Sequence, residues 1–90
     1  MKIIETALQV LNDEIDGINL LKKFFDSNFE DAVKTIFNSN GKVVVTGVGK
    51  SGHVGRKISA TLSSTGTPSF FINPTEASHG DMGMIEKNDV

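Results

Sequence analysis

A glycine-rich run, Gly47-Val48-Gly49-Lys50-Ser51-Gly52, is the part of this chain whose residue types and spacing best suit chemistry. Glycines let the backbone approach an anion closely, and a helix that follows them would offer free N–H groups and the positive end of its dipole. Lys50 adds a cation at the same place. The run therefore predicts an anion-binding turn of the kind that suits a sugar phosphate. The alternative is a plain tight turn with Lys50 extended into solvent.

The spacing of the glycines resembles two nucleotide-binding motifs but completes neither. The pattern G-x-G-x-x-G is met by Gly47, Gly49 and Gly52. A dinucleotide site also needs an acidic residue about 20 positions later, and Ile72 and Asn73 stand there. A P-loop needs a glycine five positions before Gly49, and that position is Val44. We therefore expect neither an NAD site nor an ATPase.

Two further side chains could move a proton. His79 precedes Gly80-Asp81 and could act as a proton shuttle, or make a purely structural hydrogen bond. No third ligand accompanies His79 and Asp81, so we predict no metal site, although His79 could hold an adventitious ion. Glu76 could act as an acid or base, but its position after Pro74 favours a role in stabilising a helix dipole.

The cations and the histidine next to the glycine run are expected to have lesser roles. His53 would lie at a helix start and is predicted to be structural or interfacial. Arg56 and Lys57 are predicted to face solvent or a neighbouring subunit.

The first 40 residues are expected to form helices. Apolar residues recur at spacings of three and four from Ile4 to about Phe25, which predicts one amphipathic helix interrupted only by Gly17. A second helix is predicted from Phe29 to about Asn38, capped by Ser27 or Asn28. The apolar stripe of the first helix is a candidate for the core or for a subunit interface.

The rest of the chain predicts a βαβ unit, which forms part of a parallel sheet. Lys42–Thr46 is a β-branched run without alternation, as in a strand buried on both faces. A helix is expected from about His53 to Ser64, and a second strand over Ser69–Ile72. Residues Lys87–Val90 would then turn toward a third strand that the sequence does not contain.

Composition excludes several classes of protein. The chain has 90 residues, 9 basic and 11 acidic, and no cysteine. We therefore expect one domain at most, no clustered basic surface for nucleic acid, and neither disulfides nor a cysteine nucleophile. No apolar run approaches the roughly 20 residues that cross a bilayer, so a cytoplasmic protein without membrane contact is expected.

Three blocks of the chain carry a resemblance to a known family: Gly41–Lys57, Ser64–Phe71 and Glu76–Met84. In order and spacing they resemble the start of the sugar isomerase (SIS) domain of bacterial D-arabinose-5-phosphate isomerases. Two positions depart from the pattern, Thr75 and Ser78, where glycine and alanine are expected. The resemblance implies an α/β fold, in which N-terminal helices (1–40) precede the first βαβ part (41–90) of a parallel, Rossmann-like SIS sheet. The remainder of that sheet, and the CBS domains that follow it in typical members, would be absent.

The resemblance also implies an activity. Members interconvert D-arabinose 5-phosphate and D-ribulose 5-phosphate through an enediol, on the route to the lipopolysaccharide and capsule sugar Kdo. They act as tetramers and require no cofactor. Carried over by position, Lys50 and His79 would be catalytic. Substrate would be bound by Gly47, Gly49, Ser51 and Gly52.

The same resemblance leaves two alternatives open. The family's serine-rich phosphate loop, catalytic glutamates and a further histidine lie beyond a third strand, after the position that Val90 occupies. A non-catalytic sugar-phosphate-binding SIS module, or an inactive fragment held together by pairing of the first helix, therefore stands beside the isomerase.

Overall fold

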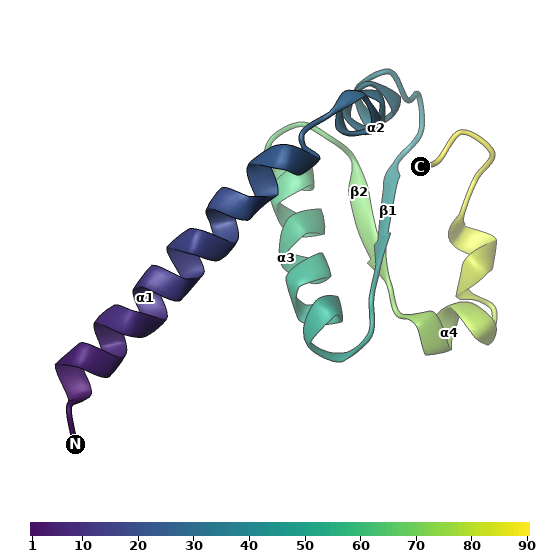
Figure 1. The fold of residues 1–90 in the computed structure, drawn as a ribbon. Coiled ribbons are helices and arrows are strands. Elements are labelled where there is room, and N and C mark those ends of the chain that lie inside the picture. Colours follow the sequence, from purple (N-terminus) through teal and green to yellow (C-terminus); the bar gives the residue numbers. More distant parts are fainter. The chain divides into compact units, whose positions relative to one another are not determined.

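The computed structural model describes residues 1 to 90, which form two compact units, Met1–Val33 and Lys34–Val90 (Figure 1). The first unit is dominated by helix α1, Ile3–Leu20, followed by a 3-10 helix, η1, Leu21–Phe24. The prediction of one regular helix to Phe25 was therefore wrong in its last turn, which tightens into 3-10 geometry, as helix ends often do. Gly17 stays within α1, and nothing lies within 4 Å of the place a side chain would take.

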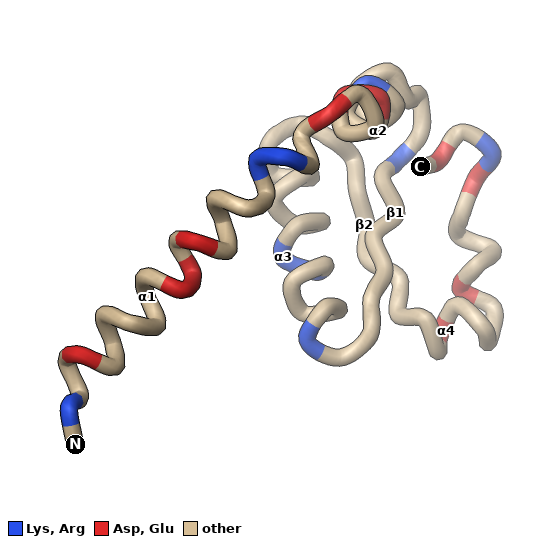
Figure 2. Tube along the Cα trace, in the orientation of Figure 1, with Lys and Arg blue, Asp and Glu red and all other residues tan.

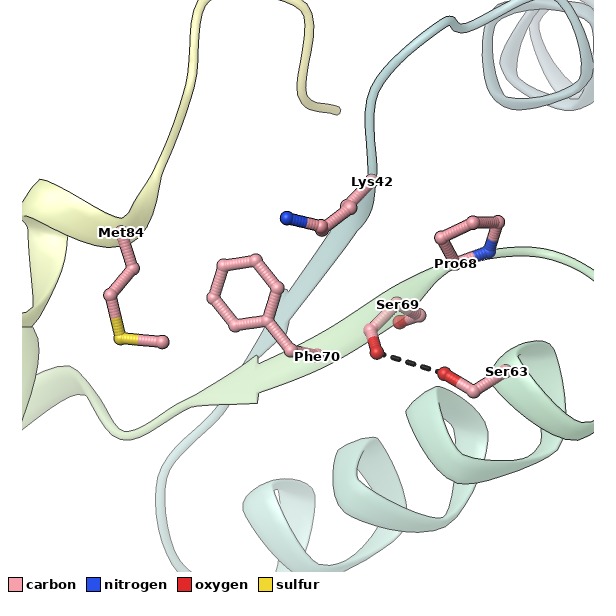
Figure 3. Close-up of a pocket in the computed structure, with 6 residues that line it drawn as sticks. All are labelled: Lys42, Ser63, Pro68, Ser69, Phe70 and Met84. Carbon is pink, nitrogen blue, oxygen red and sulfur yellow. Dashed lines mark hydrogen bonds between the residues drawn. The ribbon is translucent and has the colours of Figure 1, made fainter.

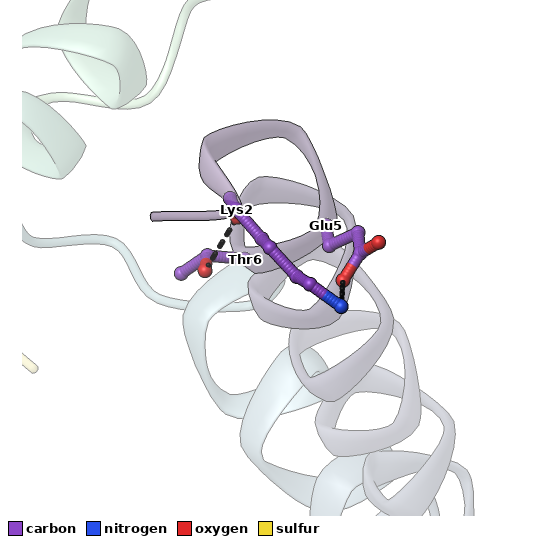
Figure 4. A network of polar contacts seen from close by, with 3 residues as sticks. All are labelled: Lys2, Glu5 and Thr6. Atoms are coloured by element: carbon purple, nitrogen blue, oxygen red, sulfur yellow. Dashed lines mark hydrogen bonds and ion pairs between the residues drawn. The ribbon is translucent and has the colours of Figure 1, made fainter.

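The start of α1 is held by short-range polar contacts (Figure 4). The Thr6 hydroxyl donates to the Lys2 carbonyl at 2.9 Å, and the Lys2 ammonium lies 3.5 Å from the Glu5 carboxylate. Both charged side chains are more than two-thirds exposed, so their attraction contributes little to stability. No residue of α1 is buried, and its apolar stripe is uncovered within this unit. None of the helices is long and apolar enough to cross a lipid bilayer.

Helix α2, Ser27–Phe37, begins two residues earlier than the sequence suggested. The cap is Asp26, whose carboxylate accepts hydrogen bonds from the backbone N–H groups of Asn28 (3.0 Å) and Phe29 (3.2 Å). The prediction of Ser27 or Asn28 as the cap was wrong, because an aspartate just ahead of them satisfies the first turn instead.

The second unit contains the predicted βαβ arrangement. Strands β1, Val43–Thr46, and β2, Ser69–Ile72, pair in parallel, and α3, Gly49–Ser64, connects them. Helix α3 packs on the sheet through small residues at a spacing of three to four: Gly52, Gly55 and Ser59. Small side chains at these positions let the helix lie close to the strands.

The last residue extends the sheet on the other edge of β1. The Val44 N–H donates to the Val90 carbonyl at 2.7 Å, and the Val90 N–H donates to the Lys42 carbonyl at 3.0 Å. This is the parallel pairing pattern, and it lies opposite the edge that β2 occupies. The predicted turn toward a third strand is therefore present, and β1 has chain on both of its edges.

The other side of the sheet faces a short helix, α4, Pro74–Ser78, and a 3-10 helix, η2, Asp81–Met84 (Figure 1). Asn73 caps α4 by accepting from the Thr75 N–H at 2.9 Å. Cover is thin, since Val43 and Ile72 are the only buried apolar residues in the chain. The expectation that the first strand is buried on both faces was wrong, because β1 beyond Val43 is half-buried or exposed within these 90 residues.

Candidate functional site

The glycine run is mostly helix rather than loop. Helix α3 begins at Gly49, four residues earlier than predicted, so only Gly47 and Val48 separate it from β1. Gly49 has a φ of 55°, in the left-handed region that glycine adopts without strain. This conformation turns the chain directly from the strand into the helix. Lys50, Ser51 and Gly52 consequently lie in the first turn of α3.

Gly47 and Gly52 touch each other, which gives them a packing role. A Cβ atom on Gly52 would lie 2.6 Å from the Gly47 carbonyl oxygen. This would be a steric clash, and because the carbonyl belongs to the backbone it could not rotate away as a flexible side chain could. The spacing of these two glycines therefore reflects close packing of the helix start against the end of the strand. That role supports the structural interpretation of Gly47 and Gly52.

The first turn of α3 has unused hydrogen-bond donors. No side chain caps this helix, and the first bond within it runs from the Gly52 N–H to the Val48 carbonyl at 3.2 Å. The N–H groups of Gly49, Lys50 and Ser51 therefore have no acceptor within the helix. The arrangement expected from the sequence, a cation beside free N–H groups at the carboxyl end of a strand, is the one the structure has.

Lys50 and Ser51 lie on the side of α3 that adjoins β1. They line a shallow depression of about 440 Å³, which we call the Lys50 depression, together with Val45, Thr46, Val54, Gly55 and Ile58. No residue of β2 contributes to it. The Lys50 side chain is exposed and makes no ion pair. Its ammonium is therefore accessible from solvent.

A separate pocket opens on the side of β2. This Arg56 pocket has a volume of about 210 Å³ and is lined by Gly47, Gly49, Gly52, His53, Arg56, Phe71 and Asn73. The Arg56 guanidinium lies 4.3 Å from the centre of the Phe71 ring. Arg56 is exposed, as the sequence suggested, but it stacks on the sheet instead of extending into open solvent. The structure thus divides the predicted residues, with Lys50 and Ser51 on one side and the three glycines on the other.

His79 stands apart from both cavities. It ends α4, is exposed, and its backbone N–H donates to the Glu76 carbonyl at 3.0 Å. It lines neither the Lys50 depression nor the Arg56 pocket. Glu76 lies in the first turn of α4, where a carboxylate favours the helix dipole, as expected. No three His, Asp or Glu side chains gather closely enough to hold a metal ion.

A third cavity, of about 420 Å³, lies at the opposite end of the sheet (Figure 3). Phe70 and Met84 point toward one another across it, and Lys42 supplies its only charge. Ser63 donates to the Ser69 carbonyl at 2.8 Å on its wall. Lys42 and Ser69 mark the amino ends of the strands, whereas parallel α/β sheets bind ligands at the carboxyl ends. This cavity is therefore the weaker candidate.

Two features of the site were missed by sequence reasoning. One is Arg56, whose contact with Phe71 depends on how α3 packs against β2. The other is the change of direction at β1, where β2 lies on one edge and Val90 pairs along the other. In parallel α/β sheets such a switch point marks the ligand-binding crevice. The pairing of Val90 places the end of β1, and with it the glycine run, at this point.

Comparison with known proteins identifies the family of this chain. The SIS domain model matches residues 35–90, more than half of the chain. Arabinose 5-phosphate isomerase KdsD of Francisella tularensis is 50% identical over 90 residues, and KdsD of Pseudomonas aeruginosa is 51% identical over 90 residues. The matches cover 97% and 100% of this chain but only 28% of each isomerase. GutQ of Escherichia coli K12, also an arabinose 5-phosphate isomerase, is 49% identical, with 98% of this chain and 27% of GutQ covered.

Two solved structures have the same fold. The protein c3406 of E. coli CFT073, solved in complex with arabinose 5-phosphate, superposes with a TM-score of 0.89 at 43% identity over 99% of this chain and 47% of that one. A phosphosugar isomerase involved in capsule formation from Bacteroides fragilis gives a TM-score of 0.84 at 34% identity, covering 97% of this chain and 46% of that one. The family expected from the three sequence blocks is confirmed by the domain match and by these structures: the chain belongs to the SIS domain family.

Proposed function

We propose that this protein is an aldose–ketose isomerase that interconverts D-arabinose 5-phosphate and D-ribulose 5-phosphate. The observation that carries the proposal is the identity of about 50% to named arabinose 5-phosphate isomerases across nearly all of this chain. The chain spans little more than a quarter of their length, so the activity of the whole protein is inferred from this part. The free ammonium of Lys50, beside unpaired N–H groups at the end of β1, supports the same chemistry.

The reaction moves a proton between neighbouring carbons. A base removes the proton from C2 of the aldose, and the electron pair of that C–H bond forms the C1–C2 double bond as the carbonyl electrons move to oxygen. Protonation of this oxygen gives the enediol, and a proton returned to C1 with loss of the proton from the C2 hydroxyl gives the ketose. The role proposed for Lys50 is to stabilise the negative charge on oxygen before it is protonated. The N–H groups of the first turn of α3 would share this role.

The residues of the Lys50 depression do not supply the base that would remove the C2 proton. No carboxylate or imidazole lines the Lys50 depression. In the proposal the base comes from residues outside that depression, and His79 is the candidate within this chain. The expected homo-oligomer, a tetramer in relatives, and the expected cytoplasmic location belong to the same proposal. The proposal also includes that the reaction needs no cofactor and that its product serves the synthesis of lipopolysaccharide and capsule sugars.

A binding module is the second candidate function, and the separation of Lys50 from His79 favours it. A domain of this kind would hold the sugar phosphate at the same glycines without abstracting a proton. Binding without exchange of the C2 proton would distinguish it from the isomerase.

Turnover of a panel of sugar phosphates tests the proposal. The protein is incubated with arabinose, glucose and heptose phosphates, and ketose formation is followed by proton NMR. We expect conversion of D-arabinose 5-phosphate and its loss in Lys50→Ala. The matched control is Lys57→Ala, which removes a neighbouring cation of α3 that lines neither site. Conversion that survives in Lys50→Ala would refute the role of Lys50, and binding without any conversion would favour the module.

A further inference from the structure

The Arg56 pocket has an unbalanced positive charge. Helix α3 carries three basic residues, Lys50, Arg56 and Lys57, and no acidic one (Figure 2). No Asp or Glu lines the pocket, and Arg56 makes no ion pair. A guanidinium without a carboxylate partner, in a concave site, is a charge that an oxyanion from outside the chain could balance.

Arg56 is also held in place. Its guanidinium stacks 4.3 Å above the Phe71 ring, so the planar fork is oriented before any ligand arrives. His53 lies three residues earlier on the same face of α3 and lines the same pocket. The Asn73 carboxamide oxygen is occupied by the Thr75 N–H, which leaves the amide NH₂ as its remaining donor. Three side chains thus offer donors to one small space.

The floor of the pocket is glycine backbone. Gly47, Gly49 and Gly52 line it without side chains, so a ligand can approach the main chain closely. The volume of about 210 Å³ is large enough to hold a phosphate group. Donors and charge therefore match one ligand chemistry, a phosphate-type oxyanion.

We propose that the Arg56 pocket is an oxyanion subsite, distinct from the Lys50 depression, in which Arg56 binds a phosphate group through its guanidinium fork. The two cavities share no residue, since one adjoins β1 and the other β2. An oxyanion in the subsite would contact the glycines that pack the start of α3 against β1.

The test is a titration of the isotope-labelled protein with inorganic phosphate at constant ionic strength, followed by two-dimensional NMR. We expect saturable shifts of the Gly47, Gly49 and Gly52 amides and of the Arg56 side-chain N–H. Arg56→Gln should weaken binding about tenfold, as the loss of one charge-assisted hydrogen bond predicts. The matched control, Lys57→Gln, makes the same charge change outside the pocket and should alter affinity less than about twofold.

Arg56→Lys guards against a folding defect, because it keeps the charge and the aliphatic stem while losing the fork. It should bind phosphate several-fold more weakly with an unchanged circular dichroism spectrum. Equal weakening by Arg56→Gln and Lys57→Gln, or an absence of saturable shifts, would overturn the subsite. The titration needs no turnover, so its failure would leave the proposed isomerase standing, and a failed turnover assay would leave the subsite standing.

A second arm identifies the source of the oxyanion. D-Arabinose 5-phosphate is added to the phosphate-saturated protein. If it displaces phosphate from the Arg56 resonances, the subsite serves the phosphate of a sugar phosphate. If the Arg56 resonances stay unchanged while Lys50 and Ser51 shift, the subsite serves a second phosphorylated compound. Both results support an oxyanion subsite at Arg56.

Discussion

The two cavities beside the glycine run differ in how each holds its cation. Lys50 lies in the first turn of α3, exposed and without an ion pair, in a depression otherwise lined mainly by apolar residues of β1 and α3. Arg56 lies less than two turns later, and its guanidinium is fixed on Phe71 among polar groups. The same helix therefore presents an exposed point charge on a flexible stem on one side, and a guanidinium fork stacked on a ring on the other.

This difference teaches what each cation is suited to do. A flexible ammonium can follow negative charge as it develops on a reacting oxygen, whereas a fixed guanidinium suits an oxyanion whose charge does not change during the reaction. We therefore expect Lys50 to affect the chemical step and Arg56 to affect binding.

The largest expected effect is on kcat, and it tests directly whether Lys50 and Arg56 have different roles. Lys50→Gln should lower kcat by about 10²- to 10³-fold, as the loss of one charge-stabilising group predicts, with a small change in KM. Arg56→Gln should change kcat by less than about tenfold. Steady-state kinetics of both variants check the prediction. A larger loss of kcat in Arg56→Gln than in Lys50→Gln would reverse the assignment of the two cations.

The next effect concerns the packing that the two cavities share. Gly52→Ala would place a Cβ atom 2.6 Å from the Gly47 carbonyl, and we expect a loss of about 2 kcal/mol in the free energy of unfolding. Gly55→Ala is the matched control, because its Cβ would meet side-chain atoms of Val45 and Phe71 at 3.1 and 3.2 Å, which can shift. Urea unfolding measures both. Equal stability of the two variants would contradict the close contact of Gly52 with Gly47.

A smaller effect sharpens the contrast in rigidity. Phe71→Leu removes the ring beneath Arg56 and should weaken phosphate binding about two- to fivefold, the size of an exposed cation–π contact. The kcat of Phe71→Leu for D-arabinose 5-phosphate should stay within about twofold of that of the unaltered protein, because the ring does not line the Lys50 depression. Isothermal titration and kinetics on the same preparation check both parts. Unchanged phosphate affinity would show that the ring does not orient Arg56.

The smallest expected effect is on the pH dependence of stability, and it concerns Asp89, which lines neither cavity. The backbone N–H groups of Glu86 and then Lys42 donate to the Asp89 carboxylate and lower its pKa. The stability that this contact supplies is therefore present above the pKa of the unfolded chain and is lost as the pH falls through the lower pKa of the folded state. Unfolding at a series of pH values below about 4 should show this dependence, and Asp89→Asn should reduce it. An unaltered acid profile in Asp89→Asn would contradict the contact.

The sequence predicted the strands and the family well, because the signals are local. Runs of β-branched and aromatic residues bounded by turn residues define β1 and β2, and three short blocks of contiguous residues carry the resemblance. The start of α3 was placed four residues late, since a positive φ at Gly49 cannot be read from residue types alone. The cap of α2 was missed because Asp26 precedes the serine and asparagine that looked equally suitable.

The role proposed for Arg56 could not be predicted from the sequence, for a different reason. Its partner, Phe71, is on the next strand, and their contact exists only once α3 packs on the sheet through Gly52 and Gly55. Lys50 was proposed from the sequence because it adjoins the glycines. Whether His79 lies near Lys50 also depends on tertiary structure. In this structure His79 does not line the cavity that Lys50 lines.

The most direct test of the central claim is exchange of the C2 proton of D-arabinose 5-phosphate in heavy water, followed by proton NMR. If Lys50 stabilises an enediol, deuterium should enter C2 in the presence of the protein, and exchange should fall about 10²- to 10³-fold in Lys50→Gln. Lys57→Gln should exchange as the unaltered protein does. Exchange that is equally fast in Lys50→Gln would contradict the account.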